Sequence, residues 1–344
     1  MKKNLLITTG GSGGHVVPAI ILFEHLSKEI NLILSTDKRG LKFLDKSINE
    51  FEIIDTPKLN NIFFLPFSLL KTLFLTFKSI FLLKRRKIKK VFSTGGYMSL
   101  PVILAAKFLK LEIYLLEPNL ILGRANRYFL NHCDKIFCYT NKVKNFPDIF
   151  KYKMIIIDPL VRKNIFKLNS LNSKKDIFTI LIVGGSQGAN IFDKNLKDVI
   201  VNVSKKNSIK VIQQTNEKNI SSLSDFYSKN NIENKVFSFD QKFSENLEKT
   251  DLCITRAGAS TLAELSVSNI PFIAVPLPTS KDNHQLENAN FYKNNDCCWI
   301  IEQNNFDREI EDFLMDTLVD KRDFLKKKEN LEKLNFTNYW INVH

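Results

Sequence analysis

The stretch Leu5-Leu6-Ile7-Thr8-Thr9-Gly10-Gly11-Ser12-Gly13-Gly14-His15 decides the fold of this chain. Its apolar half predicts a strand, its glycines predict a turn, and the apolar pattern of residues 17–26 predicts a helix directly afterwards. Glycine permits a positive φ and lets a ligand approach where a Cβ atom would clash. Of the 12 glycines, only Gly40 and Gly123 lie outside four such clusters, so the clusters mark expected ligand sites. The other three clusters are Gly95-Gly96-Tyr97, Gly184-Gly185-Ser186-Gln187-Gly188 and Arg256-Ala257-Gly258-Ala259.

The plan of strand, glycine turn and helix recurs in both halves of the 344-residue chain. A chain of this length exceeds what one core usually holds, and short strands of continuous apolar residues favour parallel sheets buried on both faces. We therefore predict an α/β fold of two Rossmann-like, doubly wound parallel-sheet domains that face each other across a cleft, with ligands at the carboxyl ends of the strands. The predicted domains are 1–160 and 161–325, and a helical tail, 326–344, is expected to pack back on the first domain. The expected strands are 5–8, 32–35, 91–93, 113–116, 136–139, 154–157, 177–183, 211–213, 236–239, 252–255, 272–275 and 299–301, and residues 306–333 are expected to be wholly helical.

The net charge of +14 indicates either an anionic partner or a lysine-rich composition without a specific role.

The five cysteines are odd in number and lack the paired spacing of a zinc site, so we expect them to be buried, in a protein of the reducing cytosol. The apolar run near the N-terminus is too short for a secretory signal. We expect no metal and no cofactor.

The first glycine turn is a candidate anion site. N–H groups and the positive end of a helix dipole favour a phosphate there, although the turn departs from both the GxGxxG and the Walker A patterns and could simply cap the helix. His15 lies at this helix start, where the dipole favours a neutral imidazole that can act as a general base. The alternative is that His15 only caps or packs.

The second half offers two further candidate sites. The third glycine cluster resembles the GxSxG elbow of hydrolases, with Ser186 as nucleophile, or else forms a cradle for a nucleotide diphosphate. After the fourth cluster, Ser260 and Thr261 are expected to cap a helix, and Glu264 either binds a ribose diol or complements the helix dipole. The polar cluster that includes Gln285 has the composition expected for reading sugar hydroxyls.

Residues 62–83 form a long apolar segment that ends in a basic run, Lys84-Arg85-Arg86-Lys87-Ile88-Lys89-Lys90. A helical wheel divides the segment into a side of large apolar residues and a side of Ser, Thr and Lys that also carries Leu75 and Leu82. We expect an amphipathic helix that packs one face on its domain and rests another, with Leu75 and Leu82, on an anionic membrane leaflet. The alternative is a core helix with a solvated charge run. Nucleic acid is not expected, because the basic run adjoins aliphatic rather than stacking positions.

In order and spacing, five motifs resemble the MurG family, the bacterial peptidoglycan glycosyltransferases of the GT-B fold. The resemblance extends over nearly the whole chain, with Leu116-Glu117-Pro118-Asn119 where many relatives have His-Glu-Gln-Asn. One further residue separates Pro159 from Arg162 relative to the usual Asn-Pro-Val-Arg. The motifs are residues 10–15, 95–101, 184–189, 256–264 and 282–289.

The resemblance implies an inverting transfer of N-acetylglucosamine from UDP-N-acetylglucosamine to the C4 hydroxyl of the muramyl sugar of lipid I, giving lipid II. It also implies a peripheral enzyme on the cytoplasmic face of the inner membrane, with the acceptor on the first domain and the UDP-sugar on the second. His15 would be the base. Another GT-B lipid glycosyltransferase and a GxSxG hydrolase are the alternatives. The implied substrate contacts are Ser12, Gly13 and Gly14 for the donor sugar and the acceptor diphosphate, Asn119 for the donor sugar, Ser186 and Arg162 for the donor diphosphate, Ala259, Ser260, Thr261 and Glu264 for the phosphate and ribose, and Gln285 for the sugar hydroxyls.

Overall fold

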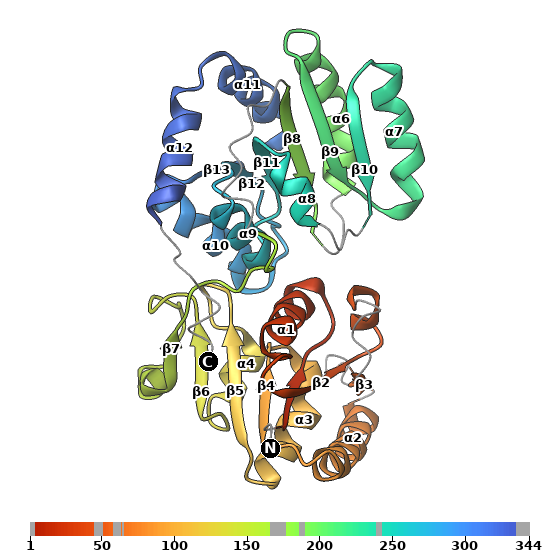
Figure 1. Cartoon of the computed structure of the whole chain (residues 1–344), viewed down its shortest axis with the longest axis vertical. Coiled ribbons are helices and arrows are strands. Elements are labelled where there is room, and N and C mark those ends of the chain that lie inside the picture. Colours follow the sequence, from red (N-terminus) through yellow and green to blue (C-terminus); the bar gives the residue numbers. More distant parts are fainter. Residues whose placement is uncertain are drawn as a thin grey trace. The chain divides into compact units, whose positions relative to one another are not determined.

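The computed structural model describes residues 4–44, 51–57, 63, 65–165, 177–185, 190–238 and 243–334. The chain divides into two compact units, and the division falls between Leu160 and Val161. We call the described residues up to Leu160 unit 1 and those from Val161 onward unit 2. Each unit contains one parallel sheet with helices on both faces (Figure 1).

Unit 1 is built on a seven-stranded parallel sheet in the order β3-β2-β1-β4-β5-β6-β7. Alternate residues of β1 pack on opposite faces of the sheet: Leu6 lies on the side of α2, α3 and α4, whereas Leu5 and Ile7 lie on the side of α1. The continuous apolar strands are thus buried on both faces, as the sequence predicts. The elements are β1 (Asn4–Thr8), α1 (Gly13–Leu26), β2 (Asn31–Thr36), β3 (Phe51–Ile53), α2 (Leu65–Arg85), β4 (Lys90–Ser93), α3 (Leu100–Phe108), β5 (Glu112–Glu117), α4 (Arg124–Phe129), β6 (Lys135–Cys138) and β7 (Met154–Ile156).

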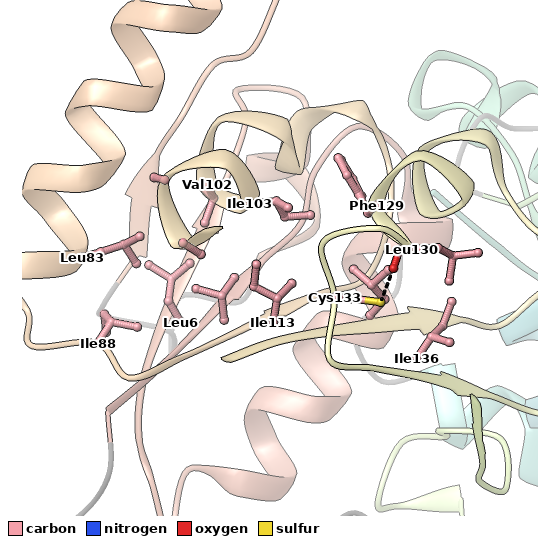
Figure 2. Packing of buried hydrophobic residues seen from close by; sticks show 14 of the residues in the cluster. Leu6, Leu83, Ile88, Val102, Ile103, Ile113, Phe129, Leu130, Cys133 and Ile136 are labelled. Carbon is pink, nitrogen blue, oxygen red and sulfur yellow. Dashed lines mark hydrogen bonds between the residues drawn. The ribbon is translucent and has the colours of Figure 1, made fainter. Parts of the chain in front are cut away.

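Buried apolar side chains form the core between the sheet and helices α2 to α4 (Figure 2). Leu6 of β1 and Ile113 of β5 lie beneath Val102 and Ile103 of α3, and Leu83 closes the cluster from α2. Cys133 lies in the same cluster and donates a weak hydrogen bond from Sγ to a backbone carbonyl. All five cysteines are buried and free, which confirms the prediction that they pack as small apolar residues.

Unit 2 repeats the design with a six-stranded parallel sheet in the order β10-β9-β8-β11-β12-β13. In β8, Ile180 and Ile182 face one core and Leu181 and Val183 face the other. The elements are β8 (Phe178–Val183), α6 (Asn190–Ser204), β9 (Ile209–Gln214), α7 (Ile220–Lys229), β10 (Glu233–Phe237), α8 (Phe243–Glu248), β11 (Leu252–Thr255), α9 (Ala259–Val267), β12 (Phe272–Ala274), α10 (His284–Asn294), β13 (Cys298–Ile300), α11 (Phe306–Val319) and α12 (Arg322–Lys333).

The glycine clusters lie at the topological switch points of the two sheets. In unit 1 the first two clusters follow β1 and β4, which pair directly, with Thr8 opposite Ser93. In unit 2 the last two follow β8 and β11, with Val183 opposite Thr255. At these positions the strand order reverses and the connections leave in opposite directions, so the turns diverge and leave room for a ligand.

Three expectations about the elements need correction. Strand β3 was not predicted, because three residues at a sheet edge carry too short a pattern. Residues 306–333 are not one helix: Asp320 is extended and its carboxylate accepts a hydrogen bond from the Arg322 backbone N–H, 3.0 Å away, at the start of α12. The predicted boundary at 325 therefore falls inside α12. The described part of the predicted tail packs on α9 in unit 2, and residues 335–344 lie outside the described part.

Helix α2 packs on its domain through the face that was expected to lie on the membrane. Ser68, Thr72 and Ser79, together with Leu75 and Leu82, are buried against the domain, and α3 is the main neighbour of α2. The buried hydroxyls are satisfied within the helix, since Thr72 donates to the Ser68 carbonyl at 2.7 Å and Ser79 to the Leu75 carbonyl at 2.8 Å. The large apolar side chains point outward. They are Phe67, Leu69, Leu70, Leu73, Phe74, Phe77 and Phe81.

This arrangement of α2 predicts that substitutions on its buried face lower the stability of the protein and that substitutions on its outward face hardly change it. Ser79 is fully buried, so Ser79→Leu should overpack the contact with α3 and cost about 1–3 kcal/mol of unfolding free energy. Phe77→Ser, on the exposed face, should change it by less than about 0.5 kcal/mol. Urea unfolding of both variants measures the difference. A larger loss for Phe77→Ser would mean that the helix packs through its phenylalanines.

Candidate active site

The first glycine turn is fastened to a buried carboxylate that the sequence analysis did not single out. Asp37 follows β2 and is fully buried, and its Oδ1 accepts hydrogen bonds from the N–H groups of Gly11 (2.8 Å) and Gly40 (2.9 Å). A Cβ on Gly10 would lie 2.7 Å from the same oxygen, so this position must be glycine. One of the N–H groups expected to bind phosphate is thus engaged within the protein.

His15 lies in the first turn of α1, and its ring is oriented by the second glycine cluster. Its Nδ1 lies 2.9 Å from the Thr94 carbonyl, which can only accept, so Nδ1 carries the proton and Nε2 carries the lone pair in the neutral ring. Side chains at Gly95 or Gly96 would approach the ring to 3.4 Å. The switch point of unit 1 therefore brings the first two glycine clusters together around one imidazole.

The other predicted contacts at this helix start lie beside His15. Ser12 is the N-cap residue of α1, and its carbonyl accepts the N–H groups of His15 and Val16 at 3.0 and 3.2 Å. Its hydroxyl makes no capping hydrogen bond. Gly13 is buried and Gly14 is exposed, so the backbone at Gly14 is open to a substrate.

Asn119 is held by another buried carboxylate. Glu117, at the carboxyl end of β5, accepts hydrogen bonds at Oε1 from the backbone and side-chain nitrogens of Asn119 at 3.2 and 3.0 Å. Its Oε2 accepts from the Gly123 N–H (2.7 Å) and from Asn126 (2.9 Å). The Asn126 amide also lies 3.4 Å from the position of a Gly95 side chain, so this network reaches the surroundings of His15.

Two glycines of unit 2 have free space beside them. A Cβ on Gly185, where φ is +75°, or on Gly258 would meet no described residue within 4 Å apart from its neighbours in the chain. Gly258 is the N-cap residue of α9, so Ala259, Ser260 and Thr261 form the first turn of that helix and present its positive dipole end. The hydroxyl oxygen of Ser260 is buried without a hydrogen-bond partner in the described residues. Ser186 lies outside the described residues.

Arg162 and Glu264 form an ion pair in unit 2, in which the carboxylate is buried and the guanidinium is partly buried. Nη1 of Arg162 lies 2.8 and 2.9 Å from the two carboxylate oxygens of Glu264, whose side chain is 3% exposed. Burial raises the pKa of Glu264, and the nearby guanidinium opposes that rise. The predicted contacts of Glu264 with ribose and of Arg162 with diphosphate stay predictions, and in this structure the two groups bind each other.

Arg256 brings a buried guanidinium to this edge of the sheet. It donates to the carbonyls of Val275 (3.0 Å) and Pro276 (3.4 Å) and to the side chain of Gln303 (2.6 Å). No carboxylate pairs with it in the described part of the chain, and burial lowers its pKa. The segment that it holds continues to Leu277, whose N–H donates to the Oε1 of Gln285 at 2.9 Å. Gln285 is thereby fixed at the start of α10.

Two family models match the chain: the glycosyltransferase family 28 N-terminal domain over residues 5–138 and the C-terminal domain of the same family over residues 179–338. The chain belongs to glycosyltransferase family 28. The matches confirm the predicted resemblance and class of enzyme, a glycosyltransferase.

Curated relatives share nearly the full length of this family 28 chain. A UDP-N-acetylglucosamine–N-acetylmuramyl-(pentapeptide) pyrophosphoryl-undecaprenol N-acetylglucosamine transferase of Pelagibacter ubique is 43% identical over 100% of this chain and 97% of its own length. The transferase of the same name from Rickettsia canadensis is 34% identical, with 96% and 95% covered. The crystal structure of Acinetobacter baumannii MurG superposes with a TM-score of 0.75 at 22% identity, covering 100% of this chain and 98% of that one, which confirms the predicted fold.

Sequence reasoning missed three of the groups that build the site: Asp37, Glu117 and Arg256. Each directly follows or ends a strand next to the switch point, and that position was the available signal. Charged residues at strand ends are common, however, and only the fold shows which of them are buried.

The Arg162–Glu264 pair leads us to predict a loss of stability that depends on pH. Arg162→Met should cost about 3 kcal/mol of unfolding free energy near neutral pH, because it leaves a buried carboxylate unpaired. Without the guanidinium, burial raises the pKa of Glu264 unopposed, so the folded state binds a proton more tightly than the unfolded state. The loss of unfolding free energy relative to wild type should therefore become smaller as the pH falls through the pKa of Glu264 in the folded state. Urea unfolding at about pH 7.5 and about pH 5 checks this.

Glu264→Gln serves as the control for that experiment, since the variant has no carboxylate at position 264 and its own stability carries no titration of that group. Equal deficits of Arg162→Met at both pH values would show that the arginine acts only through packing.

Proposed function

We propose that this chain transfers N-acetylglucosamine from UDP-N-acetylglucosamine to the C4 hydroxyl of the muramyl sugar of lipid I, with inversion, and so makes lipid II in peptidoglycan synthesis. The observation that carries the proposal is the 43% identity over the whole chain to a transferase whose name states this donor and this acceptor. Neither another lipid acceptor nor a GxSxG hydrolase finds comparable support among the relatives described above.

In the proposed reaction His15 is the general base. With the proton on Nδ1 donated to Thr94, the Nε2 lone pair takes the proton of the C4 hydroxyl as that oxygen attacks the anomeric carbon. The bond from the anomeric carbon to the UDP oxygen breaks at the same time. His15 thereby becomes an imidazolium that the Thr94 carbonyl stabilises.

Unit 2 is the proposed donor site. The open glycine turns and the first turn of α9 suit a diphosphate whose negative charge grows as UDP leaves. The buried positive charge of Arg256 adds to the favourable potential for an anion there. Gln285 is proposed to read the sugar, and Glu264 the ribose.

We further propose that unit 1 docks on the cytoplasmic face of the inner membrane through the outward face of α2. Phe74 and Phe77 are 68% and 71% exposed, although their chemistry favours burial, and the helix ends in a basic run suited to anionic lipid headgroups. Among the described residues, α2 is also the one helix long and apolar enough to cross a membrane, but its buried Ser and Thr face packs on the domain, so a surface position fits better. Such a position would place the active site next to its lipid-linked acceptor, where cell-wall growth and cell division require it.

The transfer assay is the direct test. Purified protein with labelled UDP-N-acetylglucosamine and a lipid I analogue should yield labelled lipid II analogue. His15→Gln should lower kcat by about 10²–10⁴-fold while UDP-N-acetylglucosamine binding persists, because only the proton acceptor is lost. His132→Gln, a histidine far along the chain from the turn, is the matched control. No transfer by the folded wild-type protein would refute the function, and a near-normal rate for His15→Gln would remove the residue from its role.

The membrane proposal predicts that Phe74→Ser with Phe77→Ser weakens binding to anionic vesicles by tenfold or more, since each buried Phe contributes about 2 kcal/mol. The melting temperature should not change. Val319→Ser, at an exposed apolar residue of unit 2, is the matched control and should bind normally. Vesicle sedimentation measures binding, and unaltered binding of the double variant would show that the outward face of α2 is not the docking surface. The Leu75 and Leu82 face would be a poor choice for this test, because those side chains are buried.

A further inference from the structure

Arg39 combines three contacts that hold its guanidinium over the first glycine turn. Its Nε and Nη2 both bind Oδ2 of the buried Asp37, at 2.8 and 2.6 Å. Nη2 also donates to the Tyr97 hydroxyl at 2.6 Å, and the guanidinium carbon lies 5.4 Å from the centre of that ring. Two loops, after β2 and after β4, thus fix one cation.

The guanidinium lies close to the backbone of the turn. A Cβ at Gly11 would lie 2.2 Å from the Met98 methyl, which packs against the turn there, and 3.9 Å from Nη2 of Arg39. The Gly11 N–H is engaged by Asp37 and cannot serve an anion at the same time. A negatively charged ligand at this turn therefore has one backbone donor fewer, and Arg39 is in place to supply a positive group.

Arg39 is more exposed than an arginine that only neutralises a buried carboxylate would need to be. Its side chain is 43% exposed, whereas that of Arg162, which pairs with the buried carboxylate of Glu264, is 20% exposed. Asp37 is already stabilised by two backbone N–H groups. Within the described residues, Nη1 of Arg39 has no partner, and guanidinium nitrogens suit phosphate oxygens.

We propose that Arg39 is a substrate-positioning residue that binds the diphosphate of the prenyl-diphosphate sugar acceptor at the first glycine turn. Asp37 and Tyr97 fix its guanidinium before the acceptor arrives, so little rotamer freedom is lost on binding. The inference rests on the proposed function, since it assumes an acceptor that carries a diphosphate.

The experiment compares two acceptors. One is a short-prenyl lipid I analogue with its diphosphate, and the other is the same sugar and prenyl chain joined by an uncharged linker. Arg39→Gln should raise KM for the diphosphate acceptor by about tenfold or more, and by no more than about twofold for the uncharged one, with donor KM unchanged. Arg39→Lys should recover only part of the loss. Lys42→Gln, an exposed cation in the same loop, is the matched control and should behave as wild type.

Removing Arg39 alone leaves a buried carboxylate, so a second pair of variants separates binding from folding. Asp37→Asn keeps an oxygen for the two glycine N–H groups, and Asp37→Asn with Arg39→Gln removes both charges. The single variant should keep the preference for the diphosphate acceptor and the double variant should lose it.

Equal KM changes for both acceptors, or a preference that survives in the double variant, would overturn the assignment and leave Arg39 as a structural counterion. If the wild-type protein transfers to neither acceptor, the proposed function is wrong and the inference falls with it. Wild-type transfer with no effect of Arg39→Gln rejects the inference alone.

Discussion

The arrangement of the glycine turns in this enzyme depends on two strand pairs: β1 with β4 in unit 1 and β8 with β11 in unit 2. Each pair stands at the centre of a parallel sheet, and the chain leaves its two strands toward opposite faces. The turns after those strands must therefore diverge, and the space between them cannot be filled by a direct connection. All four glycine clusters occur at these positions because the backbone must turn sharply there without side chains in the way.

Buried carboxylates make the site geometry rigid. Asp37 ties a glycine turn to the loop after β2, Glu117 fixes Asn119, and Glu264 binds Arg162. A buried carboxylate costs several kcal/mol unless donors surround it, so each one forces nearby N–H groups into defined positions. This explains why residues from different loops can be held in place on an edge where no strand or helix supports them.

The fold was predictable from sequence because its signals are local. Apolar runs mark the strands of both sheets, and the glycine turns mark their carboxyl ends, so the doubly wound architecture follows from neighbouring residues. The catalytic histidine candidate was predictable for the same reason, since His15 adjoins the glycines. The partners that orient it were not: the Thr94 carbonyl lies 79 residues away in sequence, and only strand order brings it to the ring.

Helix α2 shows why periodicity alone does not assign faces. A helical wheel separates large apolar from small polar residues, and the usual rule places the apolar side inside. Here the buried side is the small one, because Ser and Thr can satisfy their hydroxyls on the preceding turn and let α3 approach closely. The direction of amphipathicity depends on what the other face contacts, and an isolated sequence does not contain that information.

The glycines themselves serve two different purposes in the two units. In unit 1, Gly10 and Gly40 are required by what lies against them, since added side chains would collide with Asp37 or Thr36. In unit 2, a Cβ at Gly185 or Gly258 would contact none of the described residues beyond its neighbours in the chain. In the proposed reaction an anion would approach the second pair of turns through the backbone itself, whereas the first turn has given the Gly11 N–H to Asp37 and would gain from a side-chain cation. Similar glycine turns would then hold a phosphate in two chemically different ways, and the neighbouring charges would decide between them.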